Sequence, residues 1–340
     1  MGSSSKPRLV LYGIGQFGKH VVRFAHQKGW PIVAAFNRAG AKVGQDVGEL
    51  AGIGKIGVIV QDCDTADYSR IDADIGVVTS TNLLETNHDA HTRLIGAGLN
   101  VICHGTESYF PQANNPELAA RLDAMAKEMG VTFTGSGIWD MSRIWSGLLV
   151  SGPTTELKSL LHRSCTDIVP QCESKEQTYP FGNTLSIEEW NARGIRDNPI
   201  AASYSSIALH VVTALGYTVR NCTTYTEPCV FEEDYPNDFM ECTIPAGNCV
   251  GIRMVAEIET EEGLTARSEI EVRHFREGDV EHMFWEVEGM PGARIRVERD
   301  DSSHMSAACL FNRIPDVIAA PPGVQPVSKM GPLKSTALNF

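Results

Sequence analysis

The sequence predicts an α/β protein of two domains: an N-terminal doubly wound parallel sheet, then an α+β domain with a mainly antiparallel sheet. Short apolar runs alternate with helical patterns up to about residue 140, and long β-rich segments follow. A chain of 340 residues is also too long for one domain of ordinary size. We place the first domain at residues 1–140 and 300–340, with the C-terminal helix returning to it, and the second at 141–299.

Strand and helix patterns alternate regularly in the first domain. The apolar runs predict strands at residues 8–12, 31–36, 57–60, 74–79, 100–103 and 131–134. The intervening patterns predict helices at residues 15–28, 85–97 and 116–129. Strands and helices that alternate in this way form a parallel sheet with helices on both faces.

The character of the sequence changes after residue 138. Helical patterns cover a segment connecting the two domains, an interior segment and the C-terminal region, at residues 138–150, 200–215 and 302–318. The β-rich segments lie at residues 157–165, 218–230, 249–260, 265–275, 281–288 and 293–298. Because short turns join the later segments, we expect an antiparallel meander.

Composition and charge exclude several classes of protein. With 29 Lys and Arg residues against 42 Asp and Glu residues, the formal net charge is −13, which argues against nucleic acid or an anionic membrane as a partner. No run of about 18 apolar residues predicts a transmembrane helix, and the short polar N-terminus lacks the apolar region of a signal peptide.

Nine cysteines are present without a CxxC pair. Three pairs repeat a seven-residue step: Cys165 and Cys172, Cys222 and Cys229, and Cys242 and Cys249. That step is not a spacing of zinc ligands, so we expect no metal site. Reduced cysteines of this kind are typical of a cytoplasmic protein.

A glycine-rich motif follows the first strand directly and opens the first helix: Gly13-Ile-Gly15-Gln-Phe-Gly18. This context makes the GxGxxG pattern specific for dinucleotide binding. Gly13 allows a tight turn, Gly15 lets the backbone approach a pyrophosphate, and Gly18 lets helix and strand pack closely. The helix N-terminus offers free amides to the phosphates. We therefore predict a Rossmann dinucleotide-binding domain, with Gln16 and Phe17 also at the cofactor.

Two further strand ends supply candidate cofactor contacts. An NAD-selective domain usually carries Asp or Glu after its second strand, whereas this chain carries Asn37 and Arg38. Asn37 can bond the ribose, and Arg38 can pair with a 2′-phosphate or stack on adenine, which favours NADP and keeps NAD as a second cofactor. Thr79, Ser80 and Thr81 end the fourth strand, where small side chains leave room for the nicotinamide ribose.

The loop after the fifth strand, Cys103-His-Gly-Thr-Glu-Ser-Tyr-Phe-Pro111, leaves the same edge of the sheet, where the nicotinamide is expected. Glu107 is its one carboxylate. A glutamate in a closed, partly apolar cleft can transfer protons or stabilise a developing cation. We predict Glu107 as the catalytic residue, with His104 as the alternative acid or base.

Candidate substrate contacts lie around the helix that connects the domains. Ile138, Trp139 and Trp145 belong to that helix, and Tyr204 belongs to the interior helix. Clefts between domains hold small ligands against apolar walls, so these four residues are predicted to line the substrate pocket. Core packing is the alternative role of Trp145.

Four segments together resemble a known family: GIGQFG, ESYFP, GSGIWD and the segment Asn312-Arg-Ile-Pro-Asp-Val-Ile-Ala-Ala-Pro-Pro-Gly323. They resemble the 2,4-diaminopentanoate dehydrogenases and, more closely, the related native amine dehydrogenases. The resemblance implies a dihydrodipicolinate-reductase-like fold, a homodimer, and NAD(P)H-dependent reductive amination of small aldehydes or ketones with ammonia, with the reverse oxidative deamination. It also implies that Glu107 is catalytic and that Asn312 lies near the nicotinamide carboxamide.

Some features depart from that pattern and leave alternatives. Diaminopentanoate enzymes read approximately GxGINPG where this chain reads GSGIWD, and the bulky Trp139 and Trp145 favour a small aliphatic substrate over a diamine or a carboxylated one. One alternative is a dihydrodipicolinate-reductase-like reductase of another small carbonyl or imine, although the segment 161–165 lacks the lysine of that family's signature. Another is a non-catalytic NADP-binding regulator, which would need no acid or base beside the cofactor. A third, an alcohol or hydroxy-acid dehydrogenase, would need a lysine that the chain near Tyr204 does not supply.

Overall fold

The computed structural model describes residues 6–172 and 174–335. The chain divides into two compact units, one formed by Met1–Met141 with Asp301–Phe340 and the other by Ser142–Asp300. Across the described ranges, no helix combines the length and the apolar character needed to cross a membrane.

The first unit contains a parallel sheet of seven strands, in the order β15-β6-β5-β4-β1-β2-β3. Its strands are β1 (Leu9–Tyr12), β2 (Ile32–Asn37), β3 (Val60–Asp62), β4 (Ile75–Val78), β5 (Asn100–Cys103), β6 (Thr132–Gly135) and β15 (Gly323–Val324). The predicted doubly wound parallel sheet is therefore confirmed. The short edge strand β15 had no signal in the sequence analysis.

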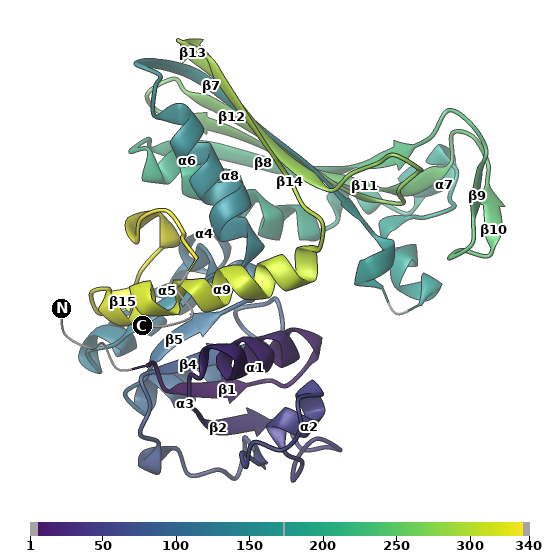
Figure 1. Cartoon of the computed structure of the whole chain (residues 1–340). Coiled ribbons are helices and arrows are strands. Elements are labelled where there is room, and N and C mark those ends of the chain that lie inside the picture. The colour runs from purple at the N-terminus through teal and green to yellow at the C-terminus, as the bar shows by residue number, and fades with distance from the viewer. Residues whose placement is uncertain (1–5, 173, 336–340) are drawn as a thin grey trace. The chain divides into compact units, whose positions relative to one another are not determined.

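Helices cover both faces of this sheet (Figure 1). On one face, the apolar sides of α1 (Gln16–Lys28), α2 (Val47–Ala51) and α9 (Ser302–Ala319) pack on the strands around Leu9, Leu11 and Ile75. On the other face, α3 (His88–Gly96) and α5 (Pro116–Glu128) pack around Val10, Val101 and Phe133, and the short α4 (Pro111–Asn114) precedes α5. Alternate residues of a strand point to opposite faces, so the central strands β1, β2, β4 and β5 contribute to both cores.

The second unit contains a sheet of six strands, in the order β14-β13-β7-β12-β11-β8. These strands are β7 (Glu156–Asp167), β8 (Val219–Val230), β11 (Cys249–Thr260), β12 (Thr265–Arg273), β13 (His282–Met290) and β14 (Ala293–Glu298). The sheet is mainly antiparallel, as expected, but the expected continuous meander is wrong. β7 lies between β12 and β13 and runs parallel to β12, because local turn patterns carry no information about a distant strand that inserts between neighbours.

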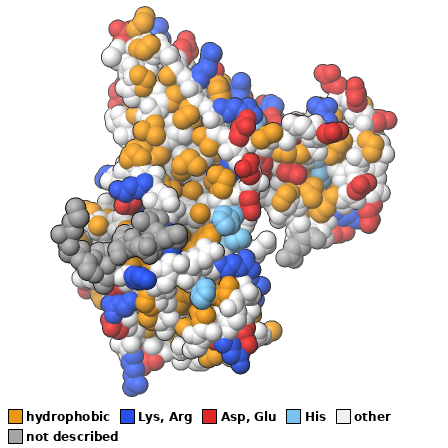
Figure 2. Space-filling model, viewed as in Figure 1, with side chains coloured by type: hydrophobic (Ala, Val, Ile, Leu, Met, Phe, Trp, Pro, Cys, Tyr) orange, Lys and Arg blue, Asp and Glu red, His pale blue; other side chains and the backbone are white. Residues whose placement is uncertain are grey.

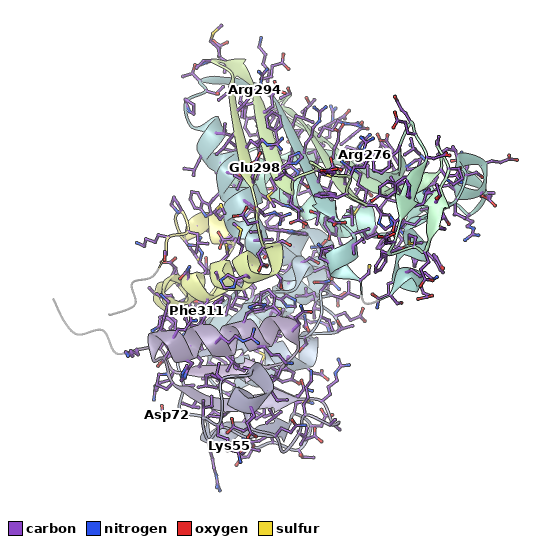
Figure 3. The ribbon with its side chains drawn as sticks, turned by 45° about the vertical axis from the view of Figure 1, so that its right-hand side comes forward. Lys55, Asp72, Arg276, Arg294, Glu298 and Phe311 are labelled. Atoms are coloured by element: carbon purple, nitrogen blue, oxygen red, sulfur yellow. The ribbon has the colours of Figure 1, made fainter. Side chains whose placement is uncertain are left out.

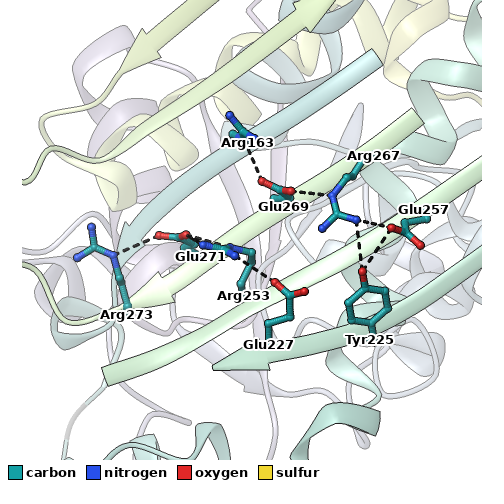
Figure 4. A network of polar contacts seen from close by, with 9 residues as sticks. All are labelled: Arg163, Tyr225, Glu227, Arg253, Glu257, Arg267, Glu269, Glu271 and Arg273. Carbon is teal, nitrogen blue, oxygen red and sulfur yellow. Dashed lines mark hydrogen bonds and ion pairs between the residues drawn. The ribbon is translucent and has the colours of Figure 1, made fainter. Parts of the chain in front are cut away.

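Two helices cover only one face of this second sheet (Figure 1). The long helix α8 (Ile200–Ala214) contacts β8, β11 and β12, while α6 (Ser146–Ser151) contacts β13 and β14. The opposite face carries Arg and Glu side chains in two groups of ion pairs, one around Glu269 and one around Glu271 (Figure 4). The second sheet therefore has one helix-covered face and one polar face.

The second unit also contains a small lobe that the sequence did not predict. It contains α7 (Ile187–Ala192) and the hairpin of β9 (Tyr235–Asn237) and β10 (Cys242–Ile244). Its own apolar cluster includes Phe231, Met240 and Ile244. Acidic side chains crowd the surface of this lobe (Figure 2), consistent with the negative net charge of the chain.

The segment that connects the units is not the regular helix predicted over residues 138–150. A π-helical turn, η3 (Asp140–Trp145), precedes α6. Within the first unit, Asp140 is bonded to Arg313 of α9. Within the second unit, the indole N–H of Trp285 donates to the carbonyl oxygen of Arg143 at 2.7 Å. Apolar spacing predicts a helix here but does not distinguish a π-helical turn from an α-helical one.

Candidate functional site

The glycine loop has the geometry of a phosphate cradle. Gly13 has φ +97°, a left-handed conformation that favours glycine, and its N–H donates to Phe36 O at 2.9 Å. A Cβ on Gly18 would collide with the carbonyl oxygen of Gly13. At Gly15, no atom of the described chain lies within 4 Å of an added Cβ, and α1 begins there without a side-chain cap. The loop is therefore closed toward the sheet and open above Gly15, as a bound pyrophosphate requires.

The ends of β4 and β1 meet at this loop. The Thr79 hydroxyl donates to the carbonyl oxygen of Gly13, and the Ser80 hydroxyl donates to Tyr12 O at 3.4 Å. A Cβ on Gly13 would lie 2.8 Å from the Ser80 hydroxyl oxygen. Thr79 and Ser80 therefore lie directly beside the glycine loop, and Thr81 follows on the same connection from β4 to α3.

The end of β2 holds the first turn of the glycine loop. The Asn37 side-chain oxygen accepts from the N–H of Ile14 at 3.2 Å, so in the structure Asn37 orders the loop. Arg38 is exposed beside it. Lys42, which the sequence analysis did not select, donates from Nζ to Ile14 O at 2.7 Å. A lysine four residues beyond Arg38 was the available signal.

Glu107 is held by the connection between β4 and α3. It lies on the 3₁₀ turn η2 (Thr106–Ser108), and its Oε2 accepts from the Leu84 N–H at 2.8 Å. Its own N–H donates to Asn82 O at 3.2 Å. A Cβ on Gly105 would lie 2.7 Å from Thr81 O, so the two loops meet at van der Waals distance. These contacts fix the carboxylate at the carboxyl edge of the sheet.

Asn87 joins the same two loops and was missed by the sequence analysis. It is 1% exposed, and its amide donates to Thr81 O at 2.8 Å and to Cys103 Sγ at 3.6 Å. Its oxygen accepts from the Thr81 N–H and hydroxyl. An Asn at the start of a helix predicts a cap, and only the folded structure shows that it bridges two strand ends instead.

His104 connects the Glu107 loop to the glycine loop. Its ring lies 4.4 Å from the Phe17 ring, centroid to centroid, with 38° between the planes. Burial lowers the pKa of His104 to about 4. The imidazole is therefore neutral near pH 7, where a general acid needs a proton, which weakens His104 as an alternative to Glu107.

Buried histidines in this unit make stability depend on pH. Burial lowers the pKa of His91, which contacts the Phe133 ring edge-on, to about 3. Between pH 6.5 and 4 the unfolded chain binds more protons at His91 and His104 than the folded chain does. The free energy of unfolding therefore decreases as the pH is lowered. From pH 7 to pH 5, we expect each to remove about 2 kcal/mol from the free energy of unfolding. Urea unfolding of the parent and His91→Gln at both pH values tests this, and an equal loss in both proteins would contradict it.

The remaining predicted site residues are distributed over both units. Asn312 lies half-buried on α9 in the first unit. Ile138 and Trp139 are also in the first unit but are buried, and the Trp139 ring lies 5.3 Å from the Tyr109 ring. In the second unit, Trp145 is half-buried at the end of η3. There, burial raises the pKa of Tyr204 on α8 above its ordinary value.

One cluster has the composition of a metal site. Among the described residues, Asp62, Cys63 and Asp64 bring candidate ligand atoms within 4.8 Å of one another at the end of β3. Arg93 already pairs with Asp64 at 2.8 Å. The cluster is an acidic group neutralised in part by arginine, and we assign it no metal.

The comparison with family models agrees with the nucleotide fold. Residues 7–102 match the model described as "Dihydrodipicolinate reductase, N-terminus". A 4-hydroxy-tetrahydrodipicolinate reductase of Archaeoglobus fulgidus is 46% identical over 61 residues, which cover 18% of this chain and 21% of that protein. Together with the parallel sheet and the glycine loop, these likenesses indicate an NAD(P)-dependent oxidoreductase.

Two relatives match over most of the chain. The 2,4-diaminopentanoate dehydrogenase of Acetoanaerobium sticklandii is 26% identical over 268 residues, covering 74% of this chain and 72% of that protein. The structure of an amine dehydrogenase from Mycobacterium smegmatis aligns with a TM-score of 0.83 and 27% identity, covering 99% of each chain. The resemblance expected from the four sequence segments is confirmed.

Proposed function

We propose that this chain is an NADP-dependent amine dehydrogenase that also accepts NAD. It converts small aliphatic aldehydes or ketones with ammonia into amines, and catalyses the reverse oxidative deamination. The observation that carries the proposal is the fixed Glu107 carboxylate at the strand edge that also bears the glycine loop. The likeness to enzymes named as amine and diaminopentanoate dehydrogenases supports the reaction class.

The first unit has the features that a nicotinamide dinucleotide needs. The space above Gly15 and the uncapped start of α1 fit a pyrophosphate. The residues we assign to the cofactor are Gly13, Gly15, Gln16, Phe17, Gly18, Asn37, Arg38, Thr79, Ser80, Thr81 and Asn312. When bound, the nicotinamide supplies the hydride in amination and accepts it in deamination.

Glu107 performs the proton chemistry in this proposal. Ammonia adds to the carbonyl carbon, and the carboxylate takes a proton from the attacking nitrogen. The protonated Glu107 then returns this proton to the hydroxyl of the carbinolamine, which leaves as water and gives a cationic iminium. The regenerated carboxylate stabilises this cation more than it stabilises the neutral carbonyl. Reduction of the iminium gives the amine, so carbonyl, ammonia, reduced cofactor and one proton yield amine, oxidised cofactor and water.

The second unit is assigned to substrate binding and dimerisation. Trp145 and Tyr204 are the apolar substrate contacts that we propose for this unit. Ile138 and Trp139 of the first unit are kept as separate candidate contacts. Large indole side chains favour a short aliphatic substrate over a charged one, because a buried charge would need a partner.

A cofactor-consumption screen of short aldehydes and ketones, with and without ammonia, tests the function. We expect oxidation of NADPH only when ammonia and a carbonyl compound are both present. Equal reduction without ammonia would contradict the proposal and favour a reductase of another carbonyl or imine. Tight NADPH binding without turnover on any mixture would favour a non-catalytic regulator.

We assign the polar face of the second sheet to a homodimer. Three of its ion pairs join neighbouring strands: Arg163 to Glu269 at 2.8 Å, Arg253 to Glu271 at 2.7 Å, and Arg267 to Glu257 (Figure 4). Arg267 also pairs with Glu269 on its own strand, β12. Because the two signs alternate, a second copy related by a twofold axis meets a complementary surface. Arg294 and Glu298 on β14 belong to the same unit (Figure 3).

Reversing one charge at the centre of this network tests the homodimer. We expect Arg267→Glu to raise the dimer dissociation constant at least about tenfold, because it gathers like charges around Glu257 and Glu269. Sedimentation equilibrium measures the constant. The control is Arg121→Glu, which changes an exposed ion pair on α5. A monomeric parent, or an unchanged constant in Arg267→Glu, would contradict the assignment.

A further inference from the structure

Lys42 contacts the first turn of the glycine loop directly. It lies between β2 and α2, and its Nζ donates to the carbonyl oxygen of Ile14 at 2.7 Å. Asn37 bonds the N–H of the same residue at 3.2 Å. Both backbone polar groups of Ile14 are thus held by side chains that follow β2. The ammonium of Lys42 is therefore fixed beside the turn between Gly13 and Gly15.

Lys42 and Arg38 lie in different electrostatic surroundings. The hydrogen bond from Arg93 and, more weakly, the charge of Arg38 hold the pKa of Asp64 below its ordinary value. Arg38 therefore lies within electrostatic range of a carboxylate. The hydrogen-bond partner of Lys42 is a neutral carbonyl, and no carboxylate within the described residues forms an ion pair with it. Its half-buried position also weakens screening by salt.

We propose that Lys42 selects the phosphorylated dinucleotide by binding the 2′-phosphate of its adenosine ribose. This inference rests on the proposed cofactor site. The ribose of a dinucleotide lies at the end of the second strand in such folds, where Asn37, Arg38 and the start of the Lys42 loop come together. An ammonium has three N–H donors. One is used on Ile14, so two remain for phosphate oxygens, and the tether to Ile14 lowers the entropy lost on binding.

Arg38 has a smaller part in this selection. Its exposed guanidinium is partly offset by Asp64 and can stack on adenine, which both dinucleotides share. Removing Arg38 is therefore expected to weaken NADPH more than NADH, but by less than removing Lys42. The sequence alone predicts that Arg38 binds the 2′-phosphate. Comparing the loss of NADPH affinity in the Arg38 and Lys42 variants therefore distinguishes that prediction from this inference.

The test is a fluorescence titration of NADPH and NADH with the full-length protein. We expect Lys42→Met to raise the Kd of NADPH by about ten- to hundredfold, which corresponds to the loss of one charge-assisted hydrogen bond. The Kd of NADH should rise by less than about threefold. Lys42→Arg should retain much of the preference for NADPH. The matched control is Lys55→Met, at an exposed lysine of the same unit (Figure 3). Thermal unfolding without cofactor checks that each variant is folded.

Each alternative outcome has a defined meaning. An equal loss of affinity for both cofactors in Lys42→Met would mean that Lys42 only orders the glycine loop, and would overturn the inference. So would unchanged NADPH binding, a parent that prefers NADH, or a larger selective effect in Arg38→Ala. If the parent binds neither dinucleotide, the proposed function itself fails. This result is distinguishable from a failure of the Lys42 inference alone, because it is measured on the parent protein.

Discussion

Glu107→Gln is expected to reduce the rate of reductive amination by about 10²-fold or more, the usual contribution of a general base. The substitution keeps the size of the side chain and an oxygen that can accept the N–H of Leu84. It removes the negative charge that stabilises the iminium and the basic oxygen that takes the proton from ammonia. The steady-state amination rate and a cofactor titration on the same preparation measure the effect.

The titration separates catalysis from cofactor binding. Because Glu107 lies on η2 and not in the glycine loop, we expect the Kd of NADPH to stay near that of the parent. The control is Glu85→Gln, which removes an exposed carboxylate of the β4–α3 connection. Turnover within about threefold of the parent, well below the effect of a general base, would remove Glu107 from the mechanism. It would redirect attention to His104.

Arg313→Met is expected to lower the free energy of unfolding by about 3–5 kcal/mol, because it leaves a carboxylate buried without its counter-ion. Arg313 and Asp140 are both 0% exposed and form a two-pronged pair, with Nη2 to Oδ1 and Nε to Oδ2 each at 2.8 Å. The Ser136 hydroxyl adds a third bond to Asp140 at 2.8 Å. The pair joins α9 to the residues after β6, so the C-terminal helix depends on it.

A double variant distinguishes the loss of a charge partner from a general packing defect. Replacing both partners, as Asp140→Leu with Arg313→Met, should recover a large part of the lost stability, since no fully buried charge is left unpaired and Asp316, the other carboxylate paired with Arg313, is partly exposed. Arg121→Met, at an exposed pair with Glu117, should cost less than about 1 kcal/mol. Denaturant unfolding of the full chain provides all the values. A cost below about 1 kcal/mol for Arg313→Met would contradict the expected effect of a buried ion pair.

Much of the first unit could be predicted because its signals are local. The strand before Gly13 and the helix after it follow from a continuous apolar run and from helical spacing. In the second unit, the strand limits Cys249–Thr260 and Ala293–Glu298 also coincide with the predicted ones. The lobe around β9 and β10 was not predicted, because its short strands carry few residues and no regular alternation.

The residues of the candidate site were also predicted only in part. Glu107, Asn37 and the glycines were selected because each follows a strand, and the carboxyl ends of parallel strands meet at one edge. Lys42 and Asn87 were missed because their roles depend on partners distant in the chain: Ile14 is 28 residues from Lys42, and Cys103 is 16 residues from Asn87. The sequence shows only a lysine four residues beyond Arg38 and an asparagine at the start of a helix, and neither feature identifies the partner.

The sequence by itself determined the alternation of strands and helices, the glycine loop and the carboxylate beside it, because hydrophobic periodicity and glycine conformation act over a few residues. Only the tertiary structure decided that β7 inserts between β12 and β13, and that the connecting segment opens into a π-helical turn. It alone paired Arg313 with Asp140, 173 residues away. These features depend on burial and on hydrogen bonds between distant segments, whose energies exist only once the chain has folded.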